Sequence, residues 1–194
     1  MDDIQLLARI VGSGDLAARL LNRFGGLRGL LHAEATELIA VPGIGSSRSN
    51  LLRALPDIAR RYYEESLPAG TAIRNPTDTN EFLRAKIGHL QHEMFCCLYL
   101  DNRHRVLRFD PLFRGTIDGT SVYPREVVKE ALASNAAAVI LAHNHPSGVA
   151  EPSQADERIT RRLKSALELV DIRLLDHLII GAAETTSLAS RGLL

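Results

Sequence analysis

The sequence contains little cysteine. Its two cysteines, Cys96 and Cys97, are neighbours inside an apolar segment. Successive strand residues face opposite sides, so a bridge between them would be strained. We therefore expect two buried free thiols rather than a disulfide or metal ligands, which suits a reducing cytoplasm.

The sequence also lacks an excess of charge and a long apolar run. Its 23 Lys and Arg residues balance 23 Asp and Glu residues, so no global field draws the chain to nucleic acid or membranes. No apolar run reaches the roughly 18 residues that cross a bilayer. The first residues, Met-Asp-Asp, are acidic, unlike the start of a secretory signal.

The composition is typical of a soluble globular protein. Hydrophobic residues make up 45% and charged residues 24% of the 194 positions, which are ordinary proportions. This length accommodates one medium domain and one small domain. No internal repeat or low-complexity segment is visible. We expect a soluble, cytoplasmic protein.

Residues 1–66 are predicted to form a small all-α domain. Apolar residues recur at helical spacing in 6–11 and 16–21, and glycines interrupt the pattern between and after these segments. The segment Val41–Gly45 (VPGIG) separates two further helices. The second is expected over Ser46–Tyr63, with a kink or a break at Pro56.

The VPGIG segment resembles the hairpin of a helix-hairpin-helix motif. Its glycines permit a tight turn and place backbone N–H groups beside a helix N-terminus, where a phosphate can bind. This interpretation predicts sequence-independent DNA contact through Gly43, Gly45 and Arg48. The alternative is a hairpin that only packs, and eight Arg against eight acidic residues in 1–66 weaken the case for phosphate binding.

A linker is predicted at residues 67–76, where two prolines and one glycine lie between helical patterns. Residues 77–194 alternate between helical and strand patterns, which predicts an α/β domain with a mixed sheet flanked by helices. Helices are expected near 79–89, 124–134 and 153–169, and strands near 93–101, 104–110, 137–142, 172–180 and 186–190.

The segment LAHNHPSGVAEPSQAD, which begins at Leu141, carries the strongest chemical signal. On an extended backbone His143 and His145 project to the same side. With Asp156 they make the three-ligand set of a catalytic zinc that keeps a fourth position for water. Each part also has an ordinary structural interpretation: Ser153 and Asp156 have the spacing of a helix capping box. A helix start is nonetheless a rigid mount for a ligand, so the two interpretations are compatible.

These residues resemble the JAMM motif of the MPN/JAB metalloprotease superfamily, and more narrowly its RadC family, a label associated with DNA repair. Supporting blocks are FRGT at 113–116, YPREVV at 123–128, NAAAVILAHNHPSG at 135–148 and DHLIIG at 176–181. The resemblance implies an MPN/JAB-like fold with a layout similar to cytidine deaminases. It also implies one Zn²⁺ per chain, held by His143, His145 and Asp156.

The resemblance also implies catalytic roles for Glu93 and Ser153. An upstream glutamate that opens an apolar strand acts as general base in the superfamily, and Glu93 occupies the matching place. Glu126 and Glu130 are competing carboxylates, but both are expected on the exposed side of a helix. Ser153 resembles the serine that steadies the oxyanion, although capping a helix would also explain it.

Other polar residues near the motif have weaker signals. Asp176 and His177 could support a ligand from the second shell, but a structural role is favoured for both. Asn144 points away from the ligands and is expected to anchor a loop, and Ser147 to shape a turn. His89, His92 and His104 lack ligand spacing.

Two functions are consistent with the sequence. The first is a zinc-dependent JAMM-type hydrolase that cleaves a peptide, isopeptide or related amide bond in a substrate that the sequence does not identify. The alternative is a DNA repair or recombination factor in which residues 1–66 bind DNA and the metal domain is a scaffold or a nuclease. A contiguous His-Asn-His does not itself indicate an HNH nuclease, whose motif residues are dispersed over a finger.

Overall fold

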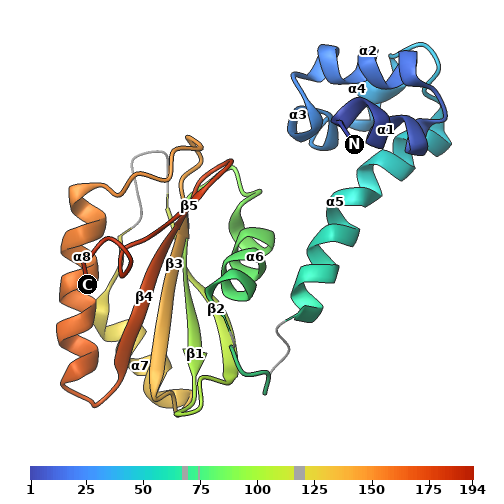
Figure 1. Ribbon diagram of the computed structural model, residues 1–194. Coiled ribbons are helices and arrows are strands. Elements are labelled where there is room, and N and C mark those ends of the chain that lie inside the picture. The colour runs from blue at the N-terminus through green and yellow to red at the C-terminus, as the bar shows by residue number, and fades with distance from the viewer. Residues whose placement is uncertain (67–69, 74, 116–120) are drawn as a thin grey trace. The chain divides into compact units, whose positions relative to one another are not determined.

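The computed structural model describes residues 1–66, 70–73, 75–115 and 121–194. They form two compact units, Met1–Tyr62 and Tyr63–Leu194 (Figure 1). Of the predicted linker, positions 67–69 and 74 lie outside the described residues. Ala72 forms a β-bridge with Arg105, so this part of the segment is tied to the second unit. Among the described residues, no helix is long and apolar enough to span a bilayer.

The first unit is helical, as predicted. Leucines from each of its helices fill one core, where Leu7, Leu20, Leu30, Leu38 and Leu52 are at most 1% exposed. Pro56 lies within the last helix, which continues through it, so of the predicted kink or break at this residue the break is wrong. The helices are α1 (Asp3–Val11), α2 (Gly14–Phe24), α3 (Leu27–Leu31), α4 (Ala35–Ile39) and α5 (Ser46–Ser66).

The VPGIG segment connects α4 to α5 as a tight turn. Val41 and Ile44 are buried in the helical core, and Gly43 has a φ of 98°, a conformation that favours glycine. The exposed Arg48 donates a hydrogen bond to the Gly43 carbonyl oxygen at 2.7 Å, and Arg19 donates one to the Pro42 carbonyl oxygen at 3.3 Å. Arg48 therefore also has an internal role in holding the turn.

The second unit is built on a mixed five-stranded sheet in the order β2-β1-β3-β4-β5, which confirms the predicted α/β fold class. Only the β3–β4 pair is parallel. The strands are β1 (Met94–Leu100), β2 (Val106–Arg114), β3 (Ala138–Asn144), β4 (Arg173–Ile180) and β5 (Thr185–Ser187).

Helices cover both faces of this sheet (Figure 1). On one face α6 (Pro76–Ile87) packs through Phe82 and Leu83 against even-numbered residues of β1 and β3. On the other face α7 (Pro124–Ala133) and α8 (Gln154–Glu168) pack against odd-numbered residues of the same strands. Because side chains alternate along a strand, His143 belongs to the α7/α8 face.

Several element boundaries differ from those expected. Helix α6 begins at Pro76 rather than Thr79, because the Asn75 side chain caps it by accepting from the Asp78 N–H at 2.8 Å. Strand β2 continues through Pro111 to Arg114, since proline is tolerated on an edge strand. Strand β5 ends at Ser187, and turns follow it.

The two cysteines are buried and free, as predicted. They lie side by side in β1 and pack on opposite faces, Cys96 with the α6 core and Cys97 with the α7/α8 core. Burial raises the pKa of Cys96 to about 12 and raises that of Cys97 as well. Both thiols are therefore protonated core groups.

Candidate metal centre

Three elements of the second unit bring the motif residues together. His143 lies near the end of β3. His145 follows the strand, and its N–H donates to the Ile180 carbonyl oxygen at the end of β4 at 2.9 Å. Asp156 lies in the first turn of α8. The predicted ligands thus come from a strand, its exit loop and a helix start.

The ligand atoms converge at distances that fit one metal ion. His143 Nε2 lies 2.9 Å from His145 Nε2 and 3.3 Å from Asp156 Oδ1, while His145 Nε2 lies 3.6 Å from Asp156 Oδ2. Tetrahedral zinc with ligand bonds of about 2 Å would separate its ligand atoms by about 3.3 Å. Within the described part of the chain these three residues form the one such His, Cys, Asp or Glu cluster.

Hydrogen bonds orient the two imidazoles so that their Nε2 atoms face each other. His145 Nδ1 lies 2.8 Å from the Val149 carbonyl oxygen. A carbonyl oxygen can only accept, so Nδ1 carries a proton, and in the neutral ring the lone pair is then on Nε2. His143 Nδ1 lies 2.8 Å from His177 Nε2. His177, for which a structural role was favoured, therefore directly contacts a predicted ligand.

The protonation preferences of the three motif residues differ. Burial lowers the pKa of His143 to about 4, so this side chain is neutral at pH 7. The hydrogen bond with Asp156 raises the pKa of His145 against the effect of burial. Burial raises the pKa of Asp156, but its contacts with His145, His143 and Ser153 outweigh that effect and lower it. The carboxylate is therefore ionised.

Ser153 caps α8 and holds one oxygen of Asp156. Its backbone N–H and its hydroxyl donate to Asp156 Oδ2 at 2.7 and 2.6 Å, and its Oγ accepts from the Asp156 N–H at 3.2 Å. This is the predicted capping box. Among the described residues no hydrogen-bond donor is recorded for Oδ1, the oxygen that faces His143. In this geometry the Ser153 proton is engaged by Asp156 rather than directed at a substrate.

Glu93 lies directly before β1, in a segment that Asn144 attaches to the site. The Asn144 side chain accepts from the Met94 N–H at 2.8 Å and donates to the Leu90 and His92 carbonyl oxygens at 3.2 and 3.0 Å. Asn144 thus anchors a loop, as expected. The charge of Glu93 is among the smaller causes that raise the pKa of His145.

The competing carboxylates are engaged in ion pairs. Glu126 pairs with Arg125 at 3.1 Å and with Lys129 at 3.7 Å, and Glu130 pairs with Arg108 at 2.7 Å. Neither belongs to the cluster of ligand atoms. Of the three carboxylates weighed as general base, Glu93 is the one that stands among the causes of the raised pKa of His145.

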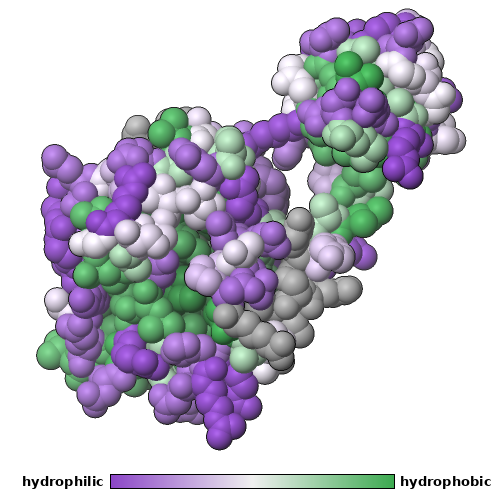
Figure 2. Space-filling model, viewed as in Figure 1, coloured by the Kyte–Doolittle hydropathy of each residue, from purple (hydrophilic) through white to green (hydrophobic). Residues whose placement is uncertain are grey.

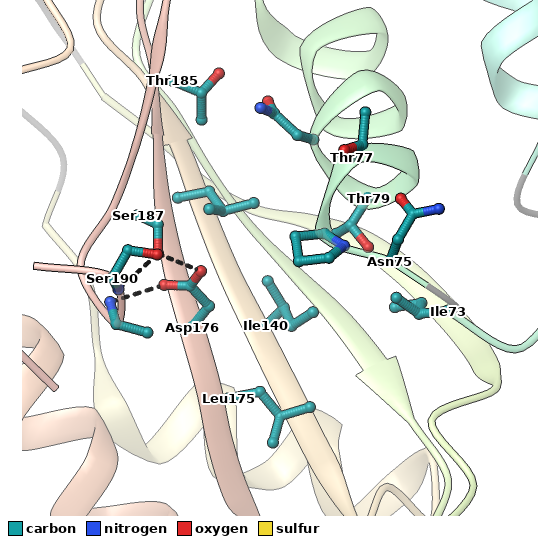
Figure 3. Close-up of a pocket in the computed structure, with 14 residues that line it drawn as sticks. Ile73, Asn75, Thr77, Thr79, Ile140, Leu175, Asp176, Thr185, Ser187 and Ser190 are labelled. Carbon is teal, nitrogen blue, oxygen red and sulfur yellow. Dashed lines mark hydrogen bonds between the residues drawn. The ribbon is translucent and has the colours of Figure 1, made fainter.

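A separate cavity of about 510 Å³ lies between α6 and strands β3 to β5 (Figure 3). Its walls include Ile140, Leu175 and Asp176, and Figure 2 shows apolar surface in the region of β4. Asp176 accepts hydrogen bonds there from the Ser187 hydroxyl and the Ala189 N–H at 2.7 and 3.0 Å. Neighbouring residues of β4 therefore serve opposite faces of the sheet: Asp176 lines this cavity, and His177 contacts the metal-ligand cluster.

The remaining polar residues of the motif region have structural contacts. The Ser147 hydroxyl accepts from the Val149 N–H at 3.4 Å, within the turn that it was expected to shape. His104 lies 3.5 Å from an Arg173 nitrogen. His89, His92 and His104 are all outside the cluster.

Comparison with known proteins shows the family of the chain. A family model for the RadC-like JAB domain matches residues 73–193, which include the five-stranded sheet and the whole ligand cluster. The chain belongs to the RadC family. The JAB domain supports membership of the JAMM/MPN superfamily, and this membership suggests a hydrolase.

Full-length relatives have similar sequences over both units. A UPF0758 protein of Thioalkalivibrio sulfidiphilus and one of Nitrosococcus oceani are each 54% identical to this RadC chain over 201 residues, covering 100% of it and 90% of the relative. A UPF0758 protein of Marinobacter nauticus is 52% identical with the same coverage. These names describe no activity.

Proposed function

We propose that this RadC chain is a zinc-dependent hydrolase that cleaves a peptide, isopeptide or related amide bond. The observation that carries the proposal is the convergence of two imidazole lone pairs and one carboxylate within 4.8 Å of one another. Three potential donor atoms so close together are arranged as they would be around a single cation. Two nitrogens and one oxygen are a donor set typical of catalytic zinc.

His143, His145 and Asp156 would hold the ion. When bound, zinc supplies Lewis acidity and lowers the pKa of the attacking water toward about 7. Glu93, in the segment held by Asn144, would accept the proton of that water and return it to the leaving amine. Ser153 would have to turn its hydroxyl away from Asp156 to donate to the oxyanion.

The test is hydrolysis by Glu93→Gln. Zinc-loaded wild-type protein is incubated with a panel of peptides and isopeptide-linked lysyl peptides, and newly released amines are measured. We expect Glu93→Gln to bind zinc normally and to lose about 10²–10⁴ in rate, the contribution of a general base. Glu126→Gln, which alters a partly buried glutamate of α7 outside the ligand cluster, is the matched control and should retain activity. Full activity in Glu93→Gln would exclude Glu93 as the base.

A second proposal concerns the helical unit. The exposed glycine turn before α5, flanked by Arg19 and Arg48, is consistent with DNA contact through phosphates. We infer that the full chain binds branched or single-stranded DNA weakly and with strong salt dependence. Arg48→Ala should reduce the slope of log affinity against log salt by about 1. No binding at low salt, measured by fluorescence anisotropy, would remove this proposal.

A further inference from the structure

A chain of hydrogen bonds runs behind the metal-ligand cluster and returns to it. It starts at His143, passes through His177 of β4 and Thr160 of α8, and ends at the backbone of Asp156. The His143 Nδ1 to His177 Nε2 distance is 2.8 Å, and the His177 Nδ1 to Thr160 Oγ1 distance is 2.6 Å. Thr160 Oγ1 lies 2.6 Å from the Asp156 carbonyl oxygen. These hydrogen bonds therefore join two of the predicted ligands, on the side opposite the proposed metal position.

The position of every proton in this chain follows from its last member. A carbonyl oxygen can only accept, so the single hydroxyl proton of Thr160 goes to Asp156. Thr160 Oγ1 must then accept from His177, which places the His177 proton on Nδ1. The remaining His177 nitrogen, Nε2, is an acceptor, so His143 donates from its own Nδ1. His143 Nε2 is left with a lone pair that faces His145 and Asp156.

The surroundings of these hydrogen bonds keep the protons in these positions. His143 is 1% exposed, and His177 and Thr160 are fully buried, so water does not offer alternative partners. The Phe95 ring stacks on His143 with a centroid separation of 6.3 Å and packs edge-on against His177 at 5.5 Å. Phe95 therefore packs against both imidazoles, while the hydrogen bonds select the tautomer.

We propose that His177 and Thr160 are positioning residues that fix His143 in the tautomer with its proton on Nδ1 and Nε2 open to the metal. Neither residue touches the ion. Thr160 also ties the orientation of His143 to the first turn of α8, which carries Asp156. This inference rests on the proposed zinc site and deepens it, because it assigns part of the zinc affinity to residues outside the ligand set.

Two pairs of variants separate the hydrogen-bonding role from packing. Thr160→Val removes the hydroxyl but keeps the shape of the side chain, whereas Thr160→Ser keeps the hydroxyl. His177→Leu removes both ring nitrogens, whereas the amide oxygen of His177→Gln can accept from His143. Zinc dissociation constants are measured for the full chain by competition with a chelating dye, with circular dichroism as the control for folding.

We expect Thr160→Val and His177→Leu to weaken zinc binding about 10- to 100-fold, the usual cost of losing a residue that orients a ligand. Thr160→Ser and His177→Gln should stay within about threefold of wild type, well below that cost. Wild-type affinity in both Thr160→Val and His177→Leu would overturn the inference. Equal losses in all four variants would also overturn it, since packing alone would then explain them.

Nitrogen-15 NMR of the metal-free protein tests the tautomer directly. The expected spectrum has the His143 proton on Nδ1 in wild type and a mixture of tautomers in Thr160→Val. A wild-type His143 protonated on Nε2 would contradict the inference whether or not the protein binds zinc. Failure of wild-type protein to bind zinc, with the expected tautomer present, would instead contradict the proposed function.

Discussion

At the scale of single residues, Ser153 combines two roles, and its replacement by alanine would remove both at once. Its hydroxyl accepts from the Asp156 N–H as the cap of α8 and donates to Asp156 Oδ2 beside the ligand cluster. Loss of a cap destabilises a protein by about 1 kcal/mol. Loss of an oxyanion donor costs about 10²–10³ in rate. The two effects are measured in different experiments.

Ser153→Ala should therefore lower the free energy of unfolding by about 1 kcal/mol and lower the hydrolysis rate as well. Asn75→Ala is the matched control, because Asn75 caps α6 with a similar hydrogen bond and does not belong to the ligand cluster. The control should lose similar stability, read from urea unfolding, and keep full activity. If Ser153→Ala is as active as Asn75→Ala, Ser153 serves only as a cap.

The buried histidines make the stability of the metal-free protein depend on pH. Burial lowers the pKa of His143 from 6.5 to about 4 and also lowers that of His177. The unfolded chain can protonate both side chains below about pH 6.5, whereas the folded protein resists this. His145, whose pKa is raised, acts in the opposite direction and offsets part of the effect.

The free energy of unfolding should thus be greatest above about pH 6.5 and fall as the pH drops toward 4. Each proton taken up on unfolding contributes about 1.4 kcal/mol per pH unit. Urea unfolding of the chelator-treated protein at several pH values measures this slope, and His177→Gln should reduce it. Stability that rises as the pH falls through this window would contradict the proton placement in the site.

At the scale of secondary-structure elements, the ends of β3 and β4 are held together by a close backbone contact. The Ala182 N–H donates to the Gly148 carbonyl oxygen at 2.8 Å. A Cβ added to Gly181 would lie 2.6 Å from that carbonyl oxygen and 2.9 Å from the Ala150 N atom. No L side chain fits there without moving the loop that follows His145.

Gly181→Ala should therefore weaken zinc binding although it alters no ligand. The added methyl group pushes the loop after β3 away from β4 and shifts His145 relative to His143. Gly14→Ala in α2, where an added Cβ meets nothing within 4 Å, is the control and should bind zinc like wild type. Equal zinc affinity of the two variants would show that the loop adapts without moving the ligands.

Features that depend on local sequence patterns could be predicted from the sequence, whereas those that depend on how strands pair could not. Alternation on an extended backbone and the capping signal at Ser153 are local patterns, and the resemblance to the JAMM motif joined Asp156 to His143 and His145 as one predicted ligand set. The role of His177 depends on the parallel register that pairs it with Leu141, and such a register is not encoded in either strand alone. The one available signal was the position of His177 among the apolar residues of DHLIIG, because a histidine buried there needs a hydrogen-bond partner.

The position of Thr160 was missed for a related reason. It lies four residues after Asp156 on α8 and bonds to its carbonyl oxygen, which is an ordinary pattern for a threonine in a helix. Only its contact with His177 makes it part of the site. The extension of β2 was missed because Pro111 suggests an end, and the edge position that tolerates it is a property of the whole sheet.

At the scale of the whole molecule, the two compact units should respond differently to zinc. The helical unit has its own apolar core, and the ligand cluster belongs entirely to the second unit. A ligand that binds only the folded state stabilises it by about 2.7 kcal/mol at 100 times its dissociation constant. Zinc should therefore stabilise only the unit that binds it.

Calorimetry of the full chain should show two thermal transitions, of which zinc raises only one. Asp156→Ala should abolish this zinc effect and leave the other transition unchanged. A single transition that moves as a whole would contradict the independence of the two units.

The zinc content of the purified full chain tests the central claim most directly. Elemental analysis, combined with anomalous scattering at the zinc edge in crystals, counts the ion and locates it. We predict one zinc per chain between His143, His145 and Asp156, and its loss in folded His143→Ala and Asp156→Ala proteins. Wild-type protein without bound zinc in zinc-containing buffer, or full zinc content in both variants, would contradict the account.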